Sequence, residues 1–216
     1  EDAQLIHDQA DRCRDILHSM GQAGKDDLHM RFAPLQAVID EAAEPHTGRG
    51  KSVNIEVLGS EDGSDQPYVY RRPEIIHGLR NLIQNAVDFS ETTVWIDISW
   101  SARRITLRII DDGAGFPASV IGRIGDPFMR HRRSEREAEK RPGYNGMGLG
   151  LFIAKTLLER TGAEITFANG SDRHDQHLHA GRRSGAIVEL SWQRDRISVA
   201  EGEENKALGE NAPFAQ

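Results

Sequence analysis

Residues 143–155 read GYNGMGLGLFIAK, and no other stretch of the chain indicates the fold so strongly. Gly146, Gly148 and Gly150 alternate with larger apolar residues and lead directly into a helical pattern. A glycine-rich turn that opens a helix brings bare backbone N–H groups close to a phosphate, and the positive end of the helix dipole attracts the anion. The stretch therefore predicts that a phosphorylated molecule binds here.

Composition limits the classes of protein to consider. The 216 residues suffice for one large domain, or one domain with an arm, and the hydrophobic share of 38% suffices for one core. The net charge of -7 predicts no nucleic-acid partner, because such domains usually carry a basic face. No apolar run approaches the roughly 18–20 residues of a membrane span. With one cysteine, the expected setting is reducing and cytosolic. Because the chain opens with Glu rather than Met, we expect a fragment of a longer protein.

The first twenty residues have the spacing of a coiled-coil helix. Apolar residues recur every three or four positions at Ala3, Ile6, Ala10, Cys13, Leu17 and Met20. Such a helix either packs on its own domain or pairs with other long helices, and the spacing favours pairing. We expect a helix over 1–22, a linker over 23–30, a domain over 31–194 and a polar, disordered tail over 195–216.

The expected domain alternates helices and strands. Period-2 patterns predict strands at 53–58, 94–100, 105–111, 164–169 and 185–192. Helical periodicity predicts helices at 34–44, 73–90 and 151–162.

Three further motifs carry possible chemistry. Asn81 and Asn85, four apart on the 73–90 helix, share a face, where their amides could help bind Mg²⁺ or simply face solvent. Asp111 ends a strand and is followed by Gly113 and Gly115, so it could accept a hydrogen bond from an exocyclic amine or form an ordinary Asp-Gly turn. Residues 48–52, GRGKS, are not a P-loop, because position 45 is Pro and a strand follows.

The motifs together, in this order, resemble the ATP-binding domain of histidine kinases, in the superfamily shared with gyrase B, Hsp90 and MutL. The resemblance covers roughly residues 28–192. NLIQNAVDFS resembles the N box, DDGAGF the G1 box, GDPFMRHRR the F box and NGMGLGLFIAK the G2 box. It implies an α+β fold of the GHKL type, a two-layer sandwich in which a mixed sheet packs on helices.

This resemblance implies roles for the base and metal residues. Asn85 would bind Mg²⁺ with Asn81 in support, and Asp111 would accept a hydrogen bond from the adenine amine. Gly113 and Gly115 would leave room for the base. The implied cofactors are ATP and Mg²⁺.

The resemblance also implies a lid and a phosphate loop. The lid would run from about residue 116 to residue 145, with Phe128 as its anchor and Arg130 reaching the γ-phosphate. The backbone of the G2 box would hold the phosphates at Gly146, Gly148, Leu149, Gly150 and Leu151.

The N box favours phosphotransfer over hydrolysis. Hydrolytic relatives place a Glu base where this chain has Asn81, so we expect poor ATPase activity and transfer to a protein. No histidine lies in the acceptor motif of the family, so the acceptor is expected on an upstream helix, with 1–22 as the second helix of that hairpin. Asp88 stands where many relatives have Lys, and a lid arginine could supply the missing charge. A serine kinase or ATPase of the superfamily, or a degenerate binding module, remain alternatives.

A narrower resemblance, to redox-responsive sensor kinases of the RegB/PrrB type, is carried by the segment DRCRDIL and by the sequences of the F and G2 boxes. That resemblance implies a parent anchored in the inner membrane, a homodimer through the N-terminal helix, a response-regulator partner and a redox role for Cys13. The residues alone leave two interpretations of Cys13. It is either a small apolar residue in a helix seam, or a thiol that Arg12 and Arg14 activate and that could form a symmetric disulfide with its copy in a parallel pair.

Overall fold

The computed structural model describes residues 31–48, 50–117, 121, 149–170 and 183–199. Their helices are α2 (Leu35–Ala43), α3 (Pro73–Phe89), α5 (Leu149–Arg160) and α6 (Arg194–Ile197), with a 3₁₀ turn η2 (Glu44–His46). Their strands are β1 (Phe32–Pro34), β2 (Ser52–Ser60), β3 (Tyr68–Tyr70), β4 (Thr93–Trp100), β5 (Arg104–Asp111), β6 (Glu164–Asn169) and β7 (Ala186–Gln193).

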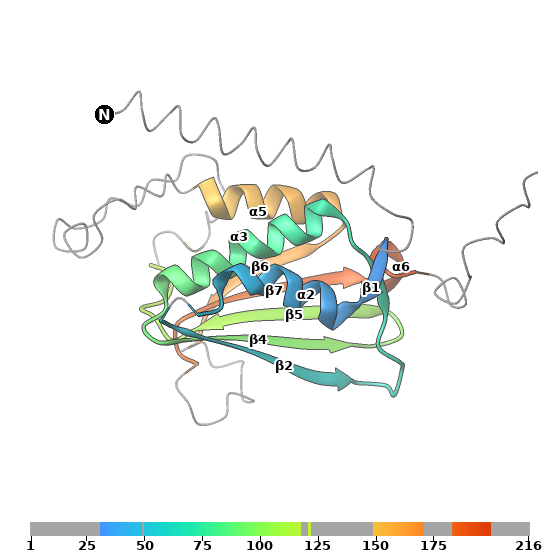
Figure 1. The fold of residues 1–216 in the computed structure, drawn as a ribbon, viewed down its shortest axis with the longest axis horizontal. Helices are drawn as coiled ribbons and strands as arrows, with labels where there is room; N and C mark the ends of the chain where they lie inside the picture. Colours follow the sequence, from blue (N-terminus) through green and yellow to red (C-terminus); the bar gives the residue numbers. More distant parts are fainter. Residues whose placement is uncertain (1–30, 49, 118–120, 122–148, 171–182, 200–216) are drawn as a thin grey trace, which may run out of the picture.

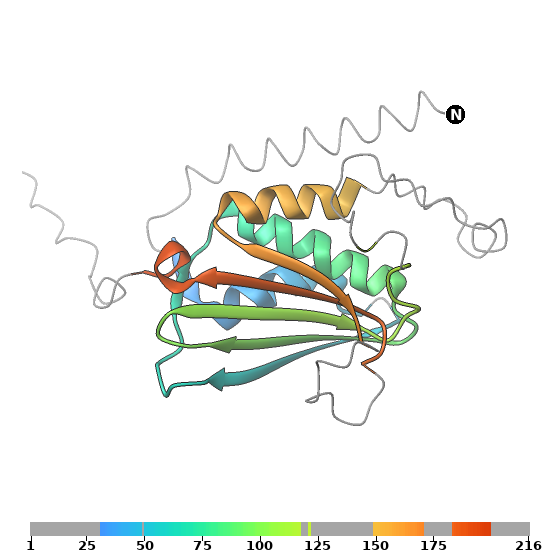
Figure 2. The same ribbon diagram turned by 180° about the vertical axis from the view of Figure 1, so that it is seen from behind.

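Five strands form a mixed sheet in the order β2-β4-β5-β7-β6. Strands β2 and β4, at one edge of the sheet, are parallel, and the other neighbouring strands are antiparallel. Helices α2, α3 and α5 cover one face of the sheet (Figures 1 and 2). The expected two-layer α+β fold is therefore confirmed.

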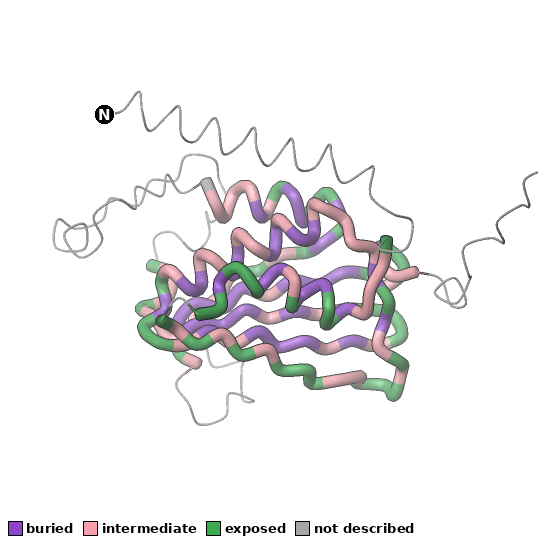
Figure 3. The backbone as a smooth tube through the Cα atoms, viewed as in Figure 1, coloured by how far each residue is buried: buried purple, intermediate pink, exposed green. Residues whose placement is uncertain are grey.

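Alternation along the strands places the core between the two layers. Ile96 on β4, Leu107 on β5 and Leu190 on β7 are buried, as are Leu79 and Ile83 on α3. Burial of each such side chain contributes about 1.5–3 kcal/mol. Figure 3 shows this burial along the central strands, whereas the edge strand β2 is mostly exposed or partly exposed.

Helices α3 and α5 approach each other closely because α3 carries a glycine at the crossing. A Cβ atom at Gly78 would lie 2.5 Å from Leu158 Cγ on α5, so only glycine fits there. Pro73 occupies the first turn of α3, where its missing N–H costs nothing and its fixed φ suits the helix. These two helices hold the motifs that the sequence singled out.

Each of the eight elements expected within the domain is present, with its ends shifted by at most two residues. The short strands β1 and β3, which pair with each other, and the four-residue α6 were not predicted. Ile197 of α6 is buried, so the packed domain continues past residue 194. Among the described residues, no helix is long and apolar enough to cross a bilayer. The predicted N-terminal helix, including Cys13, and most of the tail lie outside those residues.

Candidate functional site

The site is centred on Asp111, a buried carboxylate at the end of β5 that is 3% exposed. Its Oδ1 accepts hydrogen bonds from the backbone N–H groups of Gly113 (2.8 Å) and Ala186 (3.0 Å). Burial raises the pKa of Asp111, and these two hydrogen bonds oppose that rise by stabilising the charge. No described residue donates a hydrogen bond to Oδ2, so this oxygen can accept one from a ligand.

Three chain segments meet around Asp111, and glycines make the close approach possible. A Cβ atom at Gly113 would overlap the carbonyl oxygen of Phe89. A Cβ atom at Gly185 would lie 2.6 Å from Gly113 N and would come even closer to Asp111 Oδ1. Both glycines therefore let the neighbouring backbone pack directly against the carboxylate.

Gly115 has a different constraint, because its φ of +75° lies in the left-handed region. Beside it, Asn169 at the end of β6 binds the backbone of Phe116 twice: Phe116 N–H donates to Asn169 Oδ1 (2.7 Å), and Asn169 Nδ2 donates to Phe116 O (2.9 Å). The Phe116 ring packs edge-on against Phe167, with centroids 5.8 Å apart. The segment that follows Gly115 thus starts from a fixed point on the sheet.

The loop between α3 and β4 is held from two sides. Asp112 accepts hydrogen bonds from the backbone N–H groups of Glu91, Thr92 and Thr93 at 2.8–3.1 Å. Partial burial opposes the charge of Asp112, but these bonds and the Thr92 hydroxyl outweigh it and hold the pKa of Asp112 below its usual range.

From the other side, Lys51 Nζ donates to the carbonyl oxygens of Val87 (2.5 Å) and Ser90 (2.6 Å). A cation at this end of α3 also complements the helix dipole. The lysine of the GRGKS segment thus caps a helix C-terminus, which agrees with its exclusion as a P-loop.

Asn81 and Asn85 lie half-buried on one side of α3, as their spacing predicted. Each amide nitrogen donates to a carbonyl one turn earlier, Asn81 to His77 (2.9 Å) and Asn85 to Asn81 (2.6 Å). Asn85 also lies against the first turn of α5, because a Cβ atom at Gly150 would be 3.1 Å from its Nδ2. The Oδ1 of Asn85, to which no described residue donates, is a hard neutral oxygen of the kind that binds Mg²⁺ beside phosphates.

The described residues of the predicted site form two groups. Asp111, Gly113 and Gly115 form one group, while Asn81 and Asn85 with the start of α5 form the other. Leu149 and Gly150 are the first residues of α5, and half-buried Leu151 packs against the core. Arg130, Phe128, Gly146 and Gly148, with most of the predicted lid, lie outside the described residues.

The sequence did not reveal four residues that build the site: Lys51, Asn169, Gly185 and Ala186. Only Gly185 carried a signal, as a glycine at the start of a predicted strand. No group of three His, Cys, Asp or Glu side chains in the described ranges could form a metal site. An amide ligand such as Asn85 fits a metal that is held mainly by a bound phosphate.

Comparison with known proteins agrees with this geometry. A family model described as histidine kinase-, DNA gyrase B-, and HSP90-like ATPase matches residues 71–196, more than half of the chain. The chain belongs to this family. The predicted resemblance to the histidine kinase ATP-binding domain is thus confirmed.

Individual relatives show which members of the family the chain is similar to. The chain is 61% identical over 212 residues to the sensor histidine kinase RegB of Cereibacter sphaeroides. The alignment covers 98% of the chain and 45% of RegB. The chain therefore spans less than half the length of this relative. The chain is also 33% identical over 115 residues to the signal transduction histidine-protein kinase AfsQ2 of Streptomyces coelicolor. This alignment covers 53% of the chain and 20% of AfsQ2. The expected similarity to RegB-type kinases is confirmed.

Solved structures show the same fold. The mycobacterial sensor histidine kinase MprB aligns with a TM-score of 0.56 at 20% identity, covering 75% of this chain and 97% of that one. The catalytic domain of histidine kinase ThkA aligns with a TM-score of 0.52 at 16% identity, covering 76% and 95%. At these identities the likeness concerns the fold alone.

Proposed function

We propose that this domain binds Mg·ATP and supplies the γ-phosphoryl group to a histidine on an upstream helix, for relay to a response-regulator aspartate. The observation that carries the proposal is the buried Asp111 carboxylate, held through Oδ1 by two backbone N–H groups. Membership of the ATPase family and 61% identity to RegB support it.

Asp111 would recognise the adenine base. Its Oδ2 accepts a hydrogen bond from the exocyclic amine, while the N–H of Gly113, which packs closely because it has no Cβ atom, holds Oδ1. Guanine presents a carbonyl oxygen at the matching ring position, and two acceptors facing each other in a buried site repel. A site built around one such polar contact discriminates strongly against the wrong base.

Asn85 would bind Mg²⁺, and the start of α5 would bind the phosphates. The N–H groups of the first turn of α5 have no partner within the helix and carry its positive dipole, which favours an anion. Gly150 lets Asn85 approach this turn, so the metal ligand and the phosphate site share one wall. Mg²⁺, when bound, neutralises charge that develops on the phosphates.

Asn81 supports transfer over hydrolysis. An amide cannot take a proton from water at neutral pH, and the Asn81 nitrogen is engaged with its own helix. We propose that the acceptor histidine, the dimer contact through residues 1–22 and the membrane anchor belong to the parent protein. Arg130 and Phe128 in the lid, and a redox role for Cys13, remain predictions of the same proposal. Loss of oxidant sensitivity in the parent's Cys13→Ala variant would support the redox role.

The test is a titration of the chain with a fluorescent ATP analogue, with and without Mg²⁺. Asp111→Asn is a sharp probe, because it can keep the Oδ1 contacts while turning the Oδ2 acceptor into an N–H₂ donor that faces the adenine amine. We expect Mg²⁺-dependent binding that this variant loses, and Asn85→Ala should bind with little dependence on Mg²⁺. A guanine analogue is the control for base recognition.

A second step tests the transfer. A separate fragment with an acceptor-histidine helix should become labelled from ATP when mixed with the chain. Failure of the unmodified chain to bind ATP, or equal binding of ATP by Asp111→Asn, would refute the proposed site. Binding without label transfer would leave a nucleotide-binding module.

A further inference from the structure

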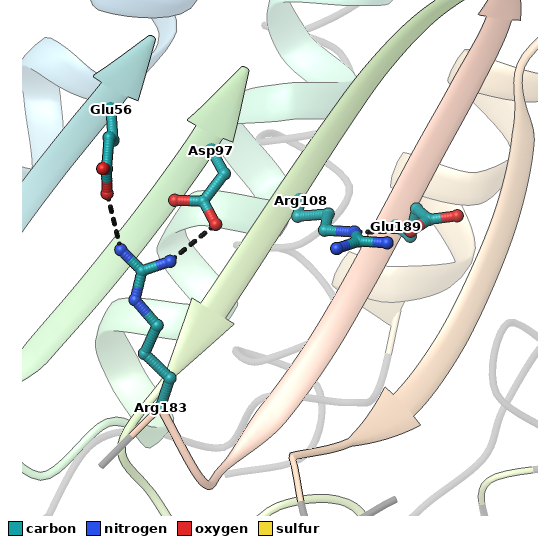
Figure 4. A network of polar contacts seen from close by, with 5 residues as sticks. All are labelled: Glu56, Asp97, Arg108, Arg183 and Glu189. Carbon is teal, nitrogen blue, oxygen red and sulfur yellow. Dashed lines mark hydrogen bonds and ion pairs between the residues drawn. The ribbon is translucent and has the colours of Figure 1, made fainter. Parts of the chain in front are cut away.

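Arg183 lies on the face of the sheet opposite the helices and reaches across two strands. Its guanidinium donates to Asp97 Oδ2 on β4 (2.6 Å) and to Glu56 Oε2 on β2 (2.7 Å) (Figure 4). It also lies over the Trp95 ring, 5.5 Å from the centroid. Only 15% of the Arg183 side chain and 8% of the Asp97 side chain are exposed. This arginine is thus held by three groups from two strands.

The backbone that carries Arg183 runs directly into the Asp111 site. A Cβ atom at Gly170, which follows β6, would overlap the carbonyl oxygen of Arg183, and Gly170 N–H donates to Gly185 O (2.9 Å). Gly185 N–H donates to Asp111 O (3.0 Å), and Ala186 N–H donates to Asp111 Oδ1. Residues 183–186 are therefore bonded to the outer face at one end and to the carboxylate at the other.

We propose that Arg183 is a positioning residue for the base site, holding residues 183–186 so that Gly185 and Ala186 keep their amides on Asp111. This inference rests on the proposed role of Asp111 in binding adenine. Arg183 itself touches no part of that site and acts only through the backbone.

The chemistry of the guanidinium–carboxylate contacts explains why Arg183 would keep residues 183–186 in place. A guanidinium presents several N–H donors in a fixed plane and binds two carboxylates at once with little added loss of freedom. Burial raises the pKa of Asp97, and Arg183 opposes that rise as the nearest cation. Removing Arg183 leaves the buried Asp97 carboxylate without its main partner, and residues 183–186 lose their side-chain bonds to Asp97 and Glu56 on the outer face.

The same face offers a matched control. Arg108 Nε on β5 donates to Glu189 Oε2 on β7 at 2.6 Å, again an arginine–carboxylate bond between strands (Figure 4). Glu189 lies within the ladder of β7, where strands on both sides hold the backbone. Arg108→Ala therefore removes a similar bond without releasing residues 183–186.

The experiment compares the unmodified chain with Arg183→Ala, Arg183→Lys and Arg108→Ala. Three quantities are measured: affinity for the ATP analogue, the midpoint of thermal unfolding, and hydrogen exchange of the Gly185 and Ala186 amides. We expect Arg183→Ala to weaken nucleotide binding about tenfold and to speed exchange at these two amides by a similar factor, as loss of one charge-assisted contact would do. Arg183→Lys should lie between, and Arg108→Ala should leave binding and both amides unchanged.

Two outcomes would overturn the inference. One is normal exchange of the Gly185 and Ala186 amides in Arg183→Ala. The other is an equal loss of binding in Arg108→Ala, which would show that any outer-face ion pair acts through general stability. Exchange is measured without nucleotide, so it decides the positioning role even if the chain binds no ATP. Failure of the proposed function, by contrast, appears as absent binding in the unmodified chain.

Discussion

Gly185→Ala tests whether close packing around Asp111 creates the base site. Gly185 does not need a left-handed φ, so alanine costs nothing in backbone conformation and only space is lost. The new Cβ would lie 2.6 Å from Gly113 N and 2.7 Å from Asp111 O, where real Cβ atoms essentially never come within 3.0 Å. Because two of its neighbours are backbone atoms, either Asp111 or the start of β7 must move.

The expected magnitude follows from what such a shift disrupts. Overpacking of this kind costs about 1–3 kcal/mol of stability. Displacement of Asp111 also weakens two hydrogen bonds to a charged group, each worth about 1.5–3 kcal/mol. If about 1.4–2.8 kcal/mol of this is lost from nucleotide binding, affinity falls about 10- to 100-fold.

The assay is titration with the ATP analogue, together with thermal unfolding of each variant. Ile105→Val is the stability control, since Ile105 is fully buried near the start of β5, at the other end of the strand from Asp111, and loss of one buried methyl group lowers stability without changing the packing around the carboxylate. The control should lower the unfolding midpoint and keep nucleotide affinity. Affinity in Gly185→Ala equal to that of the unmodified chain would refute the reasoning, because Asp111 would then not depend on this packing.

Three further predictions concern the supports of the site. Lys51→Met should lower the free energy of unfolding by about 1–2 kcal/mol, because it removes a cation from the end of a helix; an unchanged urea midpoint would contradict this. Asp112→Asn should destabilise the fold at neutral pH. Because the folded pKa of Asp112 lies below its ordinary value of 3.8, its contribution is complete above that value and is lost as the pH falls below it, so the two unfolding curves should converge in acid. Asn169→Leu should speed hydrogen exchange at Phe116 and cost about 1–3 kcal/mol, since both backbone groups of Phe116 lose their partner; protection equal to that of the unmodified chain would count against the clamp.

The larger elements were predictable because their signals are local. Pro73 and the apolar stripe of α3 lie within one stretch of chain, and so does the alternation in each strand of the main sheet. Strands of three residues, such as β1 and β3, show too little periodicity to detect, and they form because they pair with each other. The main framework is therefore encoded by local sequence patterns, whereas the short strands depend on tertiary contact.

The site divides in the same way. Asp111, Gly113 and Gly115 belong to one contiguous motif, so the sequence alone brought them together. Ala186 is 75 residues from Asp111, and Lys51 is 36 residues from Val87, so no local pattern links either pair. The resemblance supplied the roles of the motif residues, whereas the neighbours that fix them in space required the structure.

The fixed position of Asp111 has a consequence for the design of inhibitors. Its Oδ1 is engaged by the protein, so a ligand that fills the proposed base site meets an acceptor whose orientation is already set and spends little of its binding free energy on ordering it. Small rings with an exocyclic amine, such as aminopyrimidines, should therefore bind with high efficiency per atom and without any triphosphate. Fragment screening could start from this end of the nucleotide, and compounds found there could then be extended toward α5.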